Sequence, residues 1–286
     1  MKIGMVGIES KHAEFFGSLI NKEKIIPDWC VTHICPVDAP ERLDYVQEHV
    51  NAKCICKNVQ EMIDSVDAVL VITRARETHN DYAIASIKRG KPTFVDKPFL
   101  RDELQARNLL QLARQRRVPL VGGSTFCFLP EIAHWKALLR RAETVTLRYW
   151  ADPDSPFGGY SFYGSHMTDV ATTLFGRPNG VYACRTDKIV TSVLRYPKRQ
   201  VILQTSSEHH MLEVSYVVNG ATCVMRMDDS ACYACGMKAF YHAIKNNTMM
   251  EDVDRLADSV AVLNGILKSL ESGVEEKIGS ASYRYV

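Results

Sequence analysis

The chain lacks both a block of like charges and a long hydrophobic run. Its 286 residues carry 35 Lys and Arg against 33 Asp and Glu, which leaves a formal net charge of +2. No basic arm for a polyanion is present, so nucleic acid is not an expected partner. The longest apolar runs fall far short of the roughly 18 residues that span a membrane as a helix. The N-terminus leads directly into a strand-like run without the segments of a signal peptide, and we therefore expect a cytosolic location.

The nine cysteines lack the spacing of a metal site. Cys54 and Cys56 form one close pair and Cys232 and Cys235 another, but neither has a second ligand pair at the spacing of a zinc site. The number is odd, and most of the cysteines lie within apolar runs, as reduced core thiols do. We expect unpaired thiols and no metal.

Short β-branched runs alternate with longer amphipathic runs over the first 120 residues. This alternation predicts a parallel sheet wrapped by helices. Strands are expected at 2–6, 31–35, 52–56, 68–73, 92–95 and 119–121, with helices at 11–20, 40–49, 59–63, 78–89 and 102–116. Six strands with helices between them indicate a doubly wound Rossmann domain, assigned to residues 1–121, that binds NAD or NADP.

The pattern changes after residue 121, where strand-like runs predominate. They lie at 143–150, 180–183, 189–194, 200–206, 212–218 and 221–227. Asn219-Gly220 is a hairpin signal, and apolar residues three and four apart between Val253 and Leu270 mark one face of a long helix. Residues 122–286 are therefore predicted to form an α+β domain with an open, mainly antiparallel sheet that binds substrate and supports oligomerisation.

The turn after the first strand contains only one of the three glycines of a dinucleotide fingerprint. Gly7 is present, whereas Glu9 and His12 occupy the third and sixth positions. Gly7 permits a tight turn, and Ser10 can cap the following helix and offer its hydroxyl to a pyrophosphate. A bare strand-to-helix turn explains this pattern equally well.

The end of the second strand lacks the acidic residue that commonly holds the ribose of NAD. Cys35 occupies that place. Asp38 follows three residues later, either as the ribose ligand or as an ordinary residue of a surface turn. The choice between NAD and NADP stays open.

Lys97 stands at the carboxyl end of the fifth predicted strand, within Asp96-Lys97-Pro98. Ligands bind at that edge of a doubly wound sheet. A lysine there can stabilise a developing alkoxide, and Pro98 restrains the backbone that presents it. A solvated turn lysine is the alternative interpretation.

His166 precedes an apolar helix that ends at Gly176. Taking Ser165 as the N-cap puts His166 in the first helical turn, on the same face as Asp169. A histidine can gain and lose a proton near neutral pH, as the interconversion of an alcohol and a ketone requires. A purely structural cap is the alternative.

Taken in order and at their spacing, these motifs resemble the glucose-fructose oxidoreductase and inositol dehydrogenase family, Gfo/Idh/MocA. They are KIGMVG at 2–7, DAVLVIT at 67–73 with His79 after it, GKPTFVDKP at 90–98, and GSHMTD at 164–169 through Gly176, and they span nearly the whole chain. The resemblance implies that Lys97 lies beside the nicotinamide and the substrate and that His166 acts as the acid/base.

The resemblance also implies a set of site residues. Cofactor binding falls to Gly7, Ile8, Glu9, Ser10, His12, Cys35, Thr73, Arg74, His79, Asp96, Lys97 and Pro98. Catalysis falls to Lys97, His166 and Tyr163, and substrate contact to Tyr160, Asp169 and Trp150. This chain departs from the family pattern at Glu9 and His12, and at Phe162, where the family has an Asp four residues before the histidine. Tyr163 or Tyr160 is the candidate replacement as a proton relay.

The leading hypothesis is an NAD(P)-dependent oxidoreductase that acts on a hydroxyl or carbonyl of a sugar, a cyclitol or a related polar small molecule. Two alternatives stay open. One is a nucleotide-binding sensor or scaffold without redox turnover, and the other is a relative that cleaves glycosides through transient redox at bound NAD. Since open antiparallel sheets commonly pair face to face, a homodimer or homotetramer is expected.

Overall fold

The computed structural model describes residues 1–279, and their contacts divide the chain into two compact units. The first unit contains Met1–Leu129 and Ser230–Leu256, and the second contains Pro130–Asp229 and, within the described residues, 257–279. This division differs from the boundary predicted at residue 121, because the chain returns to the first unit after the second sheet. Met237, Phe240 and Ala243 of the returning segment share a hydrophobic core with Phe16 and other residues of the first unit.

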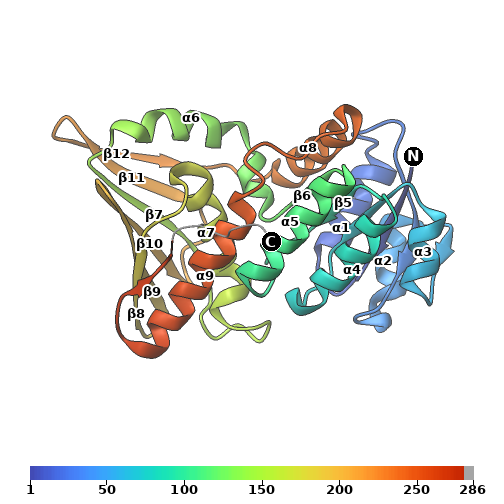
Figure 1. The fold of residues 1–286 in the computed structure, drawn as a ribbon, viewed down its shortest axis with the longest axis horizontal. Coiled ribbons are helices and arrows are strands. Elements are labelled where there is room, and N and C mark those ends of the chain that lie inside the picture. Colours follow the sequence, from blue (N-terminus) through green and yellow to red (C-terminus); the bar gives the residue numbers. More distant parts are fainter. Residues whose placement is uncertain (280–286) are drawn as a thin grey trace. The chain divides into compact units, whose positions relative to one another are not determined.

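A six-stranded parallel sheet forms the centre of the first unit (Figure 1), in the order β3-β2-β1-β4-β5-β6. The strands are β1 (Lys2–Val6), β2 (Cys30–Cys35), β3 (Cys54–Ile55), β4 (Ala68–Val71), β5 (Thr93–Val95) and β6 (Leu120–Gly122). Every neighbouring pair is parallel. This is the order of a doubly wound dinucleotide fold, and the predicted fold class is confirmed.

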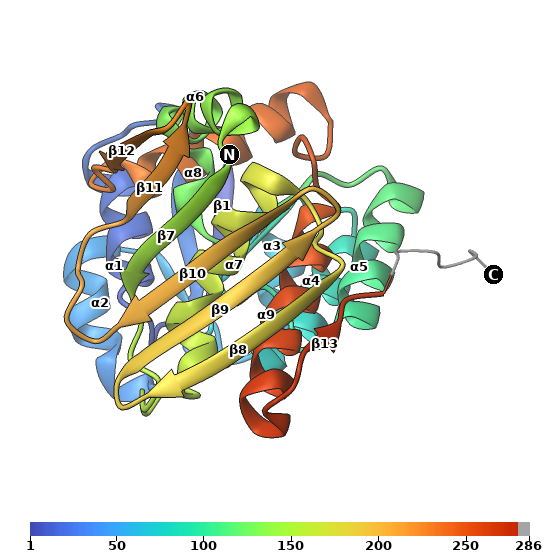
Figure 2. The ribbon, with the colours of Figure 1, turned by 90° about the vertical axis from the view of Figure 1, so that its left-hand side faces the viewer.

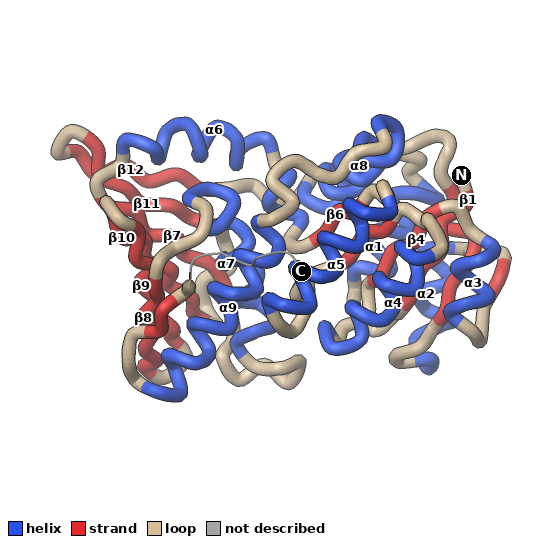
Figure 3. The backbone as a smooth tube through the Cα atoms, viewed as in Figure 1, coloured by secondary structure: helices blue, strands red, loops and turns tan. Residues whose placement is uncertain are grey.

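Burial on both faces explains the continuous apolar strands of this sheet. All four residues of β4 and all three of β5 are buried, as expected for strands covered by helices on either side. The helical segments of this unit, drawn in blue in Figure 3, are α1 (His12–Gly17), η1 (Ser18–Lys22), η2 (Pro40–Arg42), α2 (Leu43–Val50), α3 (Val59–Ser65), α4 (Arg76–Lys88), α5 (Glu103–Arg116), η3 (Thr125–Phe128) and α8 (Cys232–Asn246). α8 was not predicted, although its buried residues recur at helical spacing; they are Cys232, Gly236, Met237, Phe240 and Ala243.

The second unit is built on a seven-stranded sheet in the order β12-β11-β7-β10-β9-β8-β13 (Figure 2). Its strands are β7 (Thr144–Trp150), β8 (Gly180–Thr186), β9 (Ile189–Tyr196), β10 (Arg199–Ser206), β11 (Glu213–Val218), β12 (Ala221–Arg226) and β13 (Glu276–Lys277). Only the β7–β10 pair is parallel, so the predicted mainly antiparallel sheet is confirmed. Asn219 and Gly220 both have positive φ, as the predicted hairpin turn requires.

The helices of the second unit are α6 (Pro130–Leu138), η4 (Leu139–Arg141), α7 (Tyr160–Phe175) and α9 (Arg255–Ser272). Two contacts fix α9 within its unit. The Ser259 hydroxyl lies 2.9 Å from that of Thr168 on α7, and the Ser269 hydroxyl accepts a hydrogen bond from the Ala183 amide of β8. α9 is the long amphipathic helix that the spacing after Val253 predicts.

α7 begins earlier than the sequence suggests. Its N-cap is Gly159, in a positive-φ conformation, and Ser165 is an interior residue whose hydroxyl donates to the Phe162 carbonyl at 2.9 Å. His166 therefore lies in the second turn of the helix rather than in the first. The pair Gly158-Gly159 supplies the turn that the sequence interpretation assigned to Ser165. The predicted end at Gly176 is confirmed.

Six cysteines are free thiols, as expected: Cys30, Cys35, Cys54, Cys56, Cys184 and Cys223. Within residues 1–279, no helix is both long enough and apolar enough to cross a bilayer.

Candidate active site

The turn between β1 and α1 is pressed against the end of β4. Gly7 has a φ of +91°, and a Cβ atom built on it would lie 2.6 Å from the Thr73 Cα. Its amide donates to the Cys35 carbonyl at 3.0 Å, which ties the turn to β2. A side chain at position 7 would push the turn away from β4, so the one glycine retained from the fingerprint is the one that the geometry requires.

The Asp38 carboxylate lies against this turn rather than in solvent. One of its oxygens accepts from the Ile8 amide at 2.6 Å and from the Glu9 amide at 3.2 Å, and the other accepts from the Arg74 amide at 3.2 Å. A carboxylate held by three backbone donors is fixed beside the first turn and is not an ordinary solvated residue of a surface turn. The register of β2 alone did not show this, because Asp38 lies three residues past the strand end.

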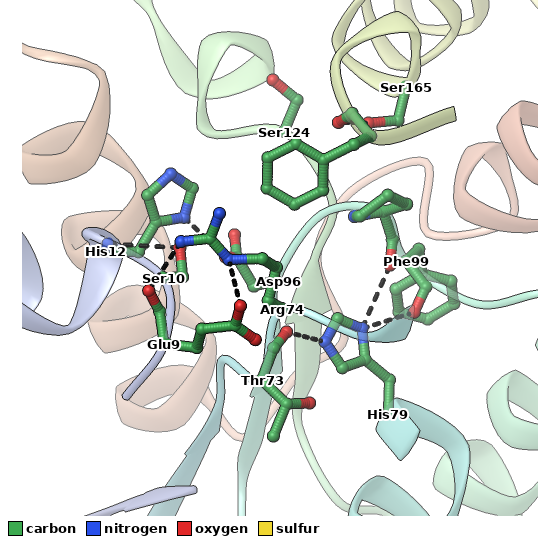
Figure 4. Close-up of polar contacts among 12 residues, drawn as sticks. Glu9, Ser10, His12, Thr73, Arg74, His79, Asp96, Phe99, Ser124 and Ser165 are labelled. Carbon is green, nitrogen blue, oxygen red and sulfur yellow. Dashed lines mark hydrogen bonds and ion pairs between the residues drawn. The ribbon is translucent and has the colours of Figure 1, made fainter. Parts of the chain in front are cut away.

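Two arginines contact the segment of the turn that contains Glu9. Arg74 donates to the Glu9 carbonyl at 2.7 Å, and its Nε lies 3.3 Å from the Glu9 carboxylate (Figure 4). Arg42 donates to the carbonyls of Ile8 and Glu9 and to the Glu14 carboxylate. Sequence reasoning missed Arg42, since no motif marks it and its partners lie about 30 residues earlier. Because Arg42 is paired with Glu14, Arg74 is the cation that faces the Glu9 carboxylate.

His12, at the position of the third fingerprint glycine, reaches across to the end of β5. Its Nδ1 lies 2.5 Å from an oxygen of Asp96, and the two residues are only 7% and 1% exposed (Figure 4). Its ring packs edge-on against Phe16 and Tyr233. Burial alone would raise the pKa of Asp96, but His12 and Lys97 outweigh that effect and hold it below its ordinary value.

Lys97 is buried at the carboxyl edge of the sheet, with 3% of its surface exposed. Burial lowers the pKa of its ammonium group to about 8; the charge of Asp96 opposes the shift, and the charge of Arg74 adds to it. The Lys97–Pro98 peptide is cis. A buried amine with a pKa near the physiological range can serve as a cation and can also exchange a proton.

His79 ties the end of β4 to the chain that follows Lys97. Its Nε2 faces the Thr73 carbonyl at 2.7 Å, and its Nδ1 faces the carbonyls of Pro98 and Phe99 at 3.0 Å each (Figure 4). The residue is fully buried. These contacts fix the backbone that follows Lys97 to the end of β4, and they give His79 a positioning role in the loop.

The second unit surrounds its candidate residues with aromatic rings. His166 is 8% exposed and packs edge-on against Tyr149, with ring centroids 5.9 Å apart. Tyr163 packs at 4.0 Å against Trp150, whose indole nitrogen donates to the Ser207 carbonyl at 2.7 Å. These contacts hold the Trp150 ring in one orientation.

Tyr160 and Asp169 are interior residues of the second unit. Tyr160 is 4% exposed, its hydroxyl faces Ser192 and Thr205 of the sheet, and burial raises its pKa to about 12. Asp169 is 2% exposed. Phe162, in the place of the family's Asp, packs between Phe157 and Tyr163. Of the two tyrosines considered as proton relays, Tyr163 is the less buried.

The residues of the first unit fit a dinucleotide. The close approach at Gly7 leaves room that a Cβ atom would fill, Asp38 stands at the ribose position, and the cationic side chains of Arg74 and Lys97 lie at the edge where phosphates and nicotinamide bind in this fold. Within the described part of the chain, no three His, Cys, Asp or Glu side chains come together as a metal site.

Comparison with known proteins agrees with this geometry. Residues 1–124 match the model of GFO_IDH_MocA, described as an oxidoreductase family with an NAD-binding Rossmann fold. The resemblance inferred from the motifs is confirmed over these residues.

Two curated relatives come from Escherichia coli K12. The uncharacterized oxidoreductase YdgJ is 27% identical over 177 residues, which cover 54% of this chain and 51% of the relative. The uncharacterized oxidoreductase YhhX is 27% identical over 218 residues, which cover 66% and 59%. The matched region thus spans between half and three fifths of these relatives.

Solved structures share the whole fold at low identity. A probable dehydrogenase from Thermotoga maritima superposes with a TM-score of 0.80 at 18% identity, covering 97% of this chain and 99% of that one. The scyllo-inositol dehydrogenase from Lactobacillus casei, solved with NAD(H) and scyllo-inositol, gives 0.82 at 14% identity, covering 98% and 99%. These similarities establish the two-unit fold.

Proposed function

We propose that the protein is an NAD-dependent dehydrogenase that interconverts a hydroxyl and a carbonyl group on a sugar, a cyclitol or a related polar small molecule. The observation that carries the proposal is Lys97, a buried amine at the ligand-binding edge of a Rossmann sheet whose sequence matches an oxidoreductase family. Burial in that place costs free energy that a solvated turn lysine would not incur, and perturbed amines of this kind cluster at functional sites.

Two side chains carry the proposed chemistry. NAD supplies the hydride acceptor or donor when it is bound. Lys97, through its Nζ ammonium group, stabilises the negative charge that develops on the substrate oxygen. His166 takes the hydroxyl proton on an imidazole nitrogen during oxidation and returns it during reduction, and Tyr163 is the neighbouring phenol that can pass it on.

Asp38 makes NAD the preferred cofactor in this proposal. A carboxylate can accept hydrogen bonds from both ribose hydroxyls, whereas it repels the additional phosphate of NADP. The three backbone amides that hold Asp38 keep it in place. Arg42 already donates to two backbone carbonyls and to Glu14, so its guanidinium is engaged by the protein.

Trp150 and Tyr163 support a ring-shaped polar substrate. Their contact holds two aromatic rings beside each other near the start of α7, and aromatic faces pack well against the C–H faces of sugars and cyclitols. The scyllo-inositol dehydrogenase of similar fold was solved with a substrate of that kind.

A homo-oligomer is also part of the proposal. Thr146, Arg148 and Gln204 lie on a half-buried, polar face of the second sheet, and large open sheets of this kind pair between copies. Light scattering of the purified protein tests this directly, and a monomer at micromolar concentration would contradict it.

The decisive experiment is a calorimetric titration with NAD⁺, NADH, NADP⁺ and NADPH, followed by a screen of polyols with the cofactor that binds. NAD⁺ should bind about tenfold or more tightly than NADP⁺, and Asp38→Ser should reduce that ratio. Cofactor reduction by one or more ring polyols supports the dehydrogenase. Binding without any reduction across the panel would favour the non-redox alternative.

A further inference from the structure

Glu9 and Arg74 form an ion pair at the rim of the proposed dinucleotide site. The Arg74 side chain is 16% exposed and that of Glu9 is 36% exposed, so the pair is anchored in the protein and open to water on the Glu9 side. The same guanidinium also donates to the Glu9 carbonyl at 2.7 Å. Arg74 therefore reaches from the end of β4 to the first turn across 65 residues of sequence (Figure 4).

Arg74 is surrounded by groups of the same site. Its backbone amide donates to Asp38, and its positive charge lowers the pKa of Lys97. The guanidinium is thus a cation at the carboxyl edge of β1 and β4, between the ribose-side carboxylate and the catalytic lysine. In Rossmann folds this edge binds the phosphates of the ligand.

We propose that Arg74 binds the diphosphate of the ligand and that Glu9 is an internal anion that holds the Arg74 guanidinium until the diphosphate replaces it. The inference rests on the proposed dinucleotide-binding function. A carboxylate and a phosphate offer a guanidinium the same paired oxygen acceptors, so one can replace the other on a single side chain.

This exchange accounts for the missing glycines of the turn. In the usual fingerprint the second glycine lets the backbone approach the pyrophosphate closely. Here Glu9 occupies that position, and a side-chain cation brought from β4 takes over the contact. A partly exposed ion pair is weak, and a diphosphate carries more charge than a carboxylate, so the exchange favours the ligand.

The test uses ADP and adenosine as probes, titrated by calorimetry into the full chain and into Glu9→Gln, Arg74→Gln and the double variant. Glu9→Gln should tighten ADP binding about three- to fivefold, since the competing carboxylate is gone. Arg74→Gln should weaken it about tenfold or more. Adenosine, which has no phosphate, should bind all four proteins alike, and its binding shows that the site is folded in each.

The double variant distinguishes direct contact between Arg74 and the diphosphate from mere neutralisation of Glu9 by Arg74. If Arg74 contacts the diphosphate, the double variant stays weaker than the wild type. If Arg74 only neutralises Glu9, removal of both charges restores wild-type affinity for ADP, and that result would overturn the proposal. Unchanged ADP affinity in Glu9→Gln would overturn the role of Glu9 as a competing anion.

Asp64 and Arg89 provide a matched control pair. They form an ion pair of 2.7 Å at the ends of α3 and α4, which lie at the opposite edge of the same sheet. Asp64→Asn and Arg89→Gln should leave ADP affinity unchanged, and an effect as large as that of Arg74→Gln would show that only overall charge matters. If the wild type binds neither ADP nor NAD, the proposed function itself is wrong. If the wild type binds NAD and Arg74→Gln leaves the affinity for ADP unchanged, only this inference is wrong.

Discussion

The two proposed catalytic side chains lie in opposite kinds of surroundings. Lys97 is buried beside charges, with Asp96 next to it and Arg74 close enough to repel it, whereas His166 is buried among rings, with Tyr149 against it. A nearby charge changes the pKa of a titratable group without touching it. An aromatic ring in contact with a side chain instead restricts the orientation of that side chain. The first unit is therefore arranged to control a charge, and the second to hold side chains in place.

The largest expected effect is the loss of turnover when either proposed catalytic side chain, Lys97 or His166, is replaced. Lys97→Met and His166→Asn should each lower turnover by about 10²–10⁴-fold, the usual contribution of a placed proton-transfer or oxyanion-stabilising group. NAD binding, measured by calorimetry, should persist in His166→Asn. Lys88→Met, at an exposed position on α4, is the matched control for the loss of a lysine. Full turnover in both active-site variants would contradict the assignment.

Loss of a buried ion-pair partner should lower the free energy of unfolding more than a substitution in the aromatic cluster does. His12→Ala leaves the buried Asp96 carboxylate without its 2.5 Å partner and should lower the free energy of unfolding by about 3–5 kcal/mol. Phe162→Leu, in the aromatic cluster, exchanges one apolar side chain for another and should cost about 1 kcal/mol. Urea denaturation of the two variants measures the difference. Equal losses would show that the His12–Asp96 pair contributes no more than ordinary packing.

The lowered pKa of Lys97 should be visible in the pH dependence of the free energy of unfolding. Its pKa is about 8 in the folded protein and near its model-compound value of 10.5 when unfolded. Between these values the unfolded chain binds one more proton, so the free energy of unfolding should rise with pH, by up to about 1.4 kcal/mol per pH unit from this group. Lys97→Met should remove that rise. A wild-type profile that stays flat or falls from pH 8 to 10 relative to Lys97→Met would contradict it.

The lowered pKa of Asp96 makes the free energy of unfolding rise with pH as well, but in the acidic range, and here the charged form is the one that stabilises the fold. Its pKa is lower in the folded protein than in the unfolded chain, so it stabilises the fold above the unfolded value, and that stabilisation is lost as pH falls through the folded value. Asp96→Asn should therefore narrow the stability difference between neutral and strongly acidic pH, as measured by urea denaturation at pH 7 and below pH 4.

The smallest expected effect concerns the aromatic cluster. Tyr163→Phe keeps the ring that packs at 4.0 Å against Trp150 and removes only the hydroxyl. If the phenol only packs, turnover should change less than about threefold; if it relays the proton, the loss should approach about 10²-fold. Steady-state assays of Tyr163→Phe beside Trp150→Phe distinguish the two roles.

Much of the fold follows from local patterns in the chain. The apolar runs at 68–73 and 92–95 predict strands buried on both faces, and β4 and β5 are buried in that way. α8 was missed although its buried residues recur at helical spacing. The start of α7 was placed too late, because Gly158-Gly159 rather than Ser165 makes the turn. Short-range signals name the type of an element more reliably than its ends.

The sequence by itself determined the six strands of the first sheet, the family resemblance, and Lys97 and His166 as the side chains suited to the chemistry. Only the tertiary structure decided how the altered first turn is held together. Asp38, Arg42 and Arg74 come to that turn from about 30 to 65 residues away in the chain. Their charges meet there because parallel strands end at one edge of the sheet, and no local pattern records which distant side chains will share that edge.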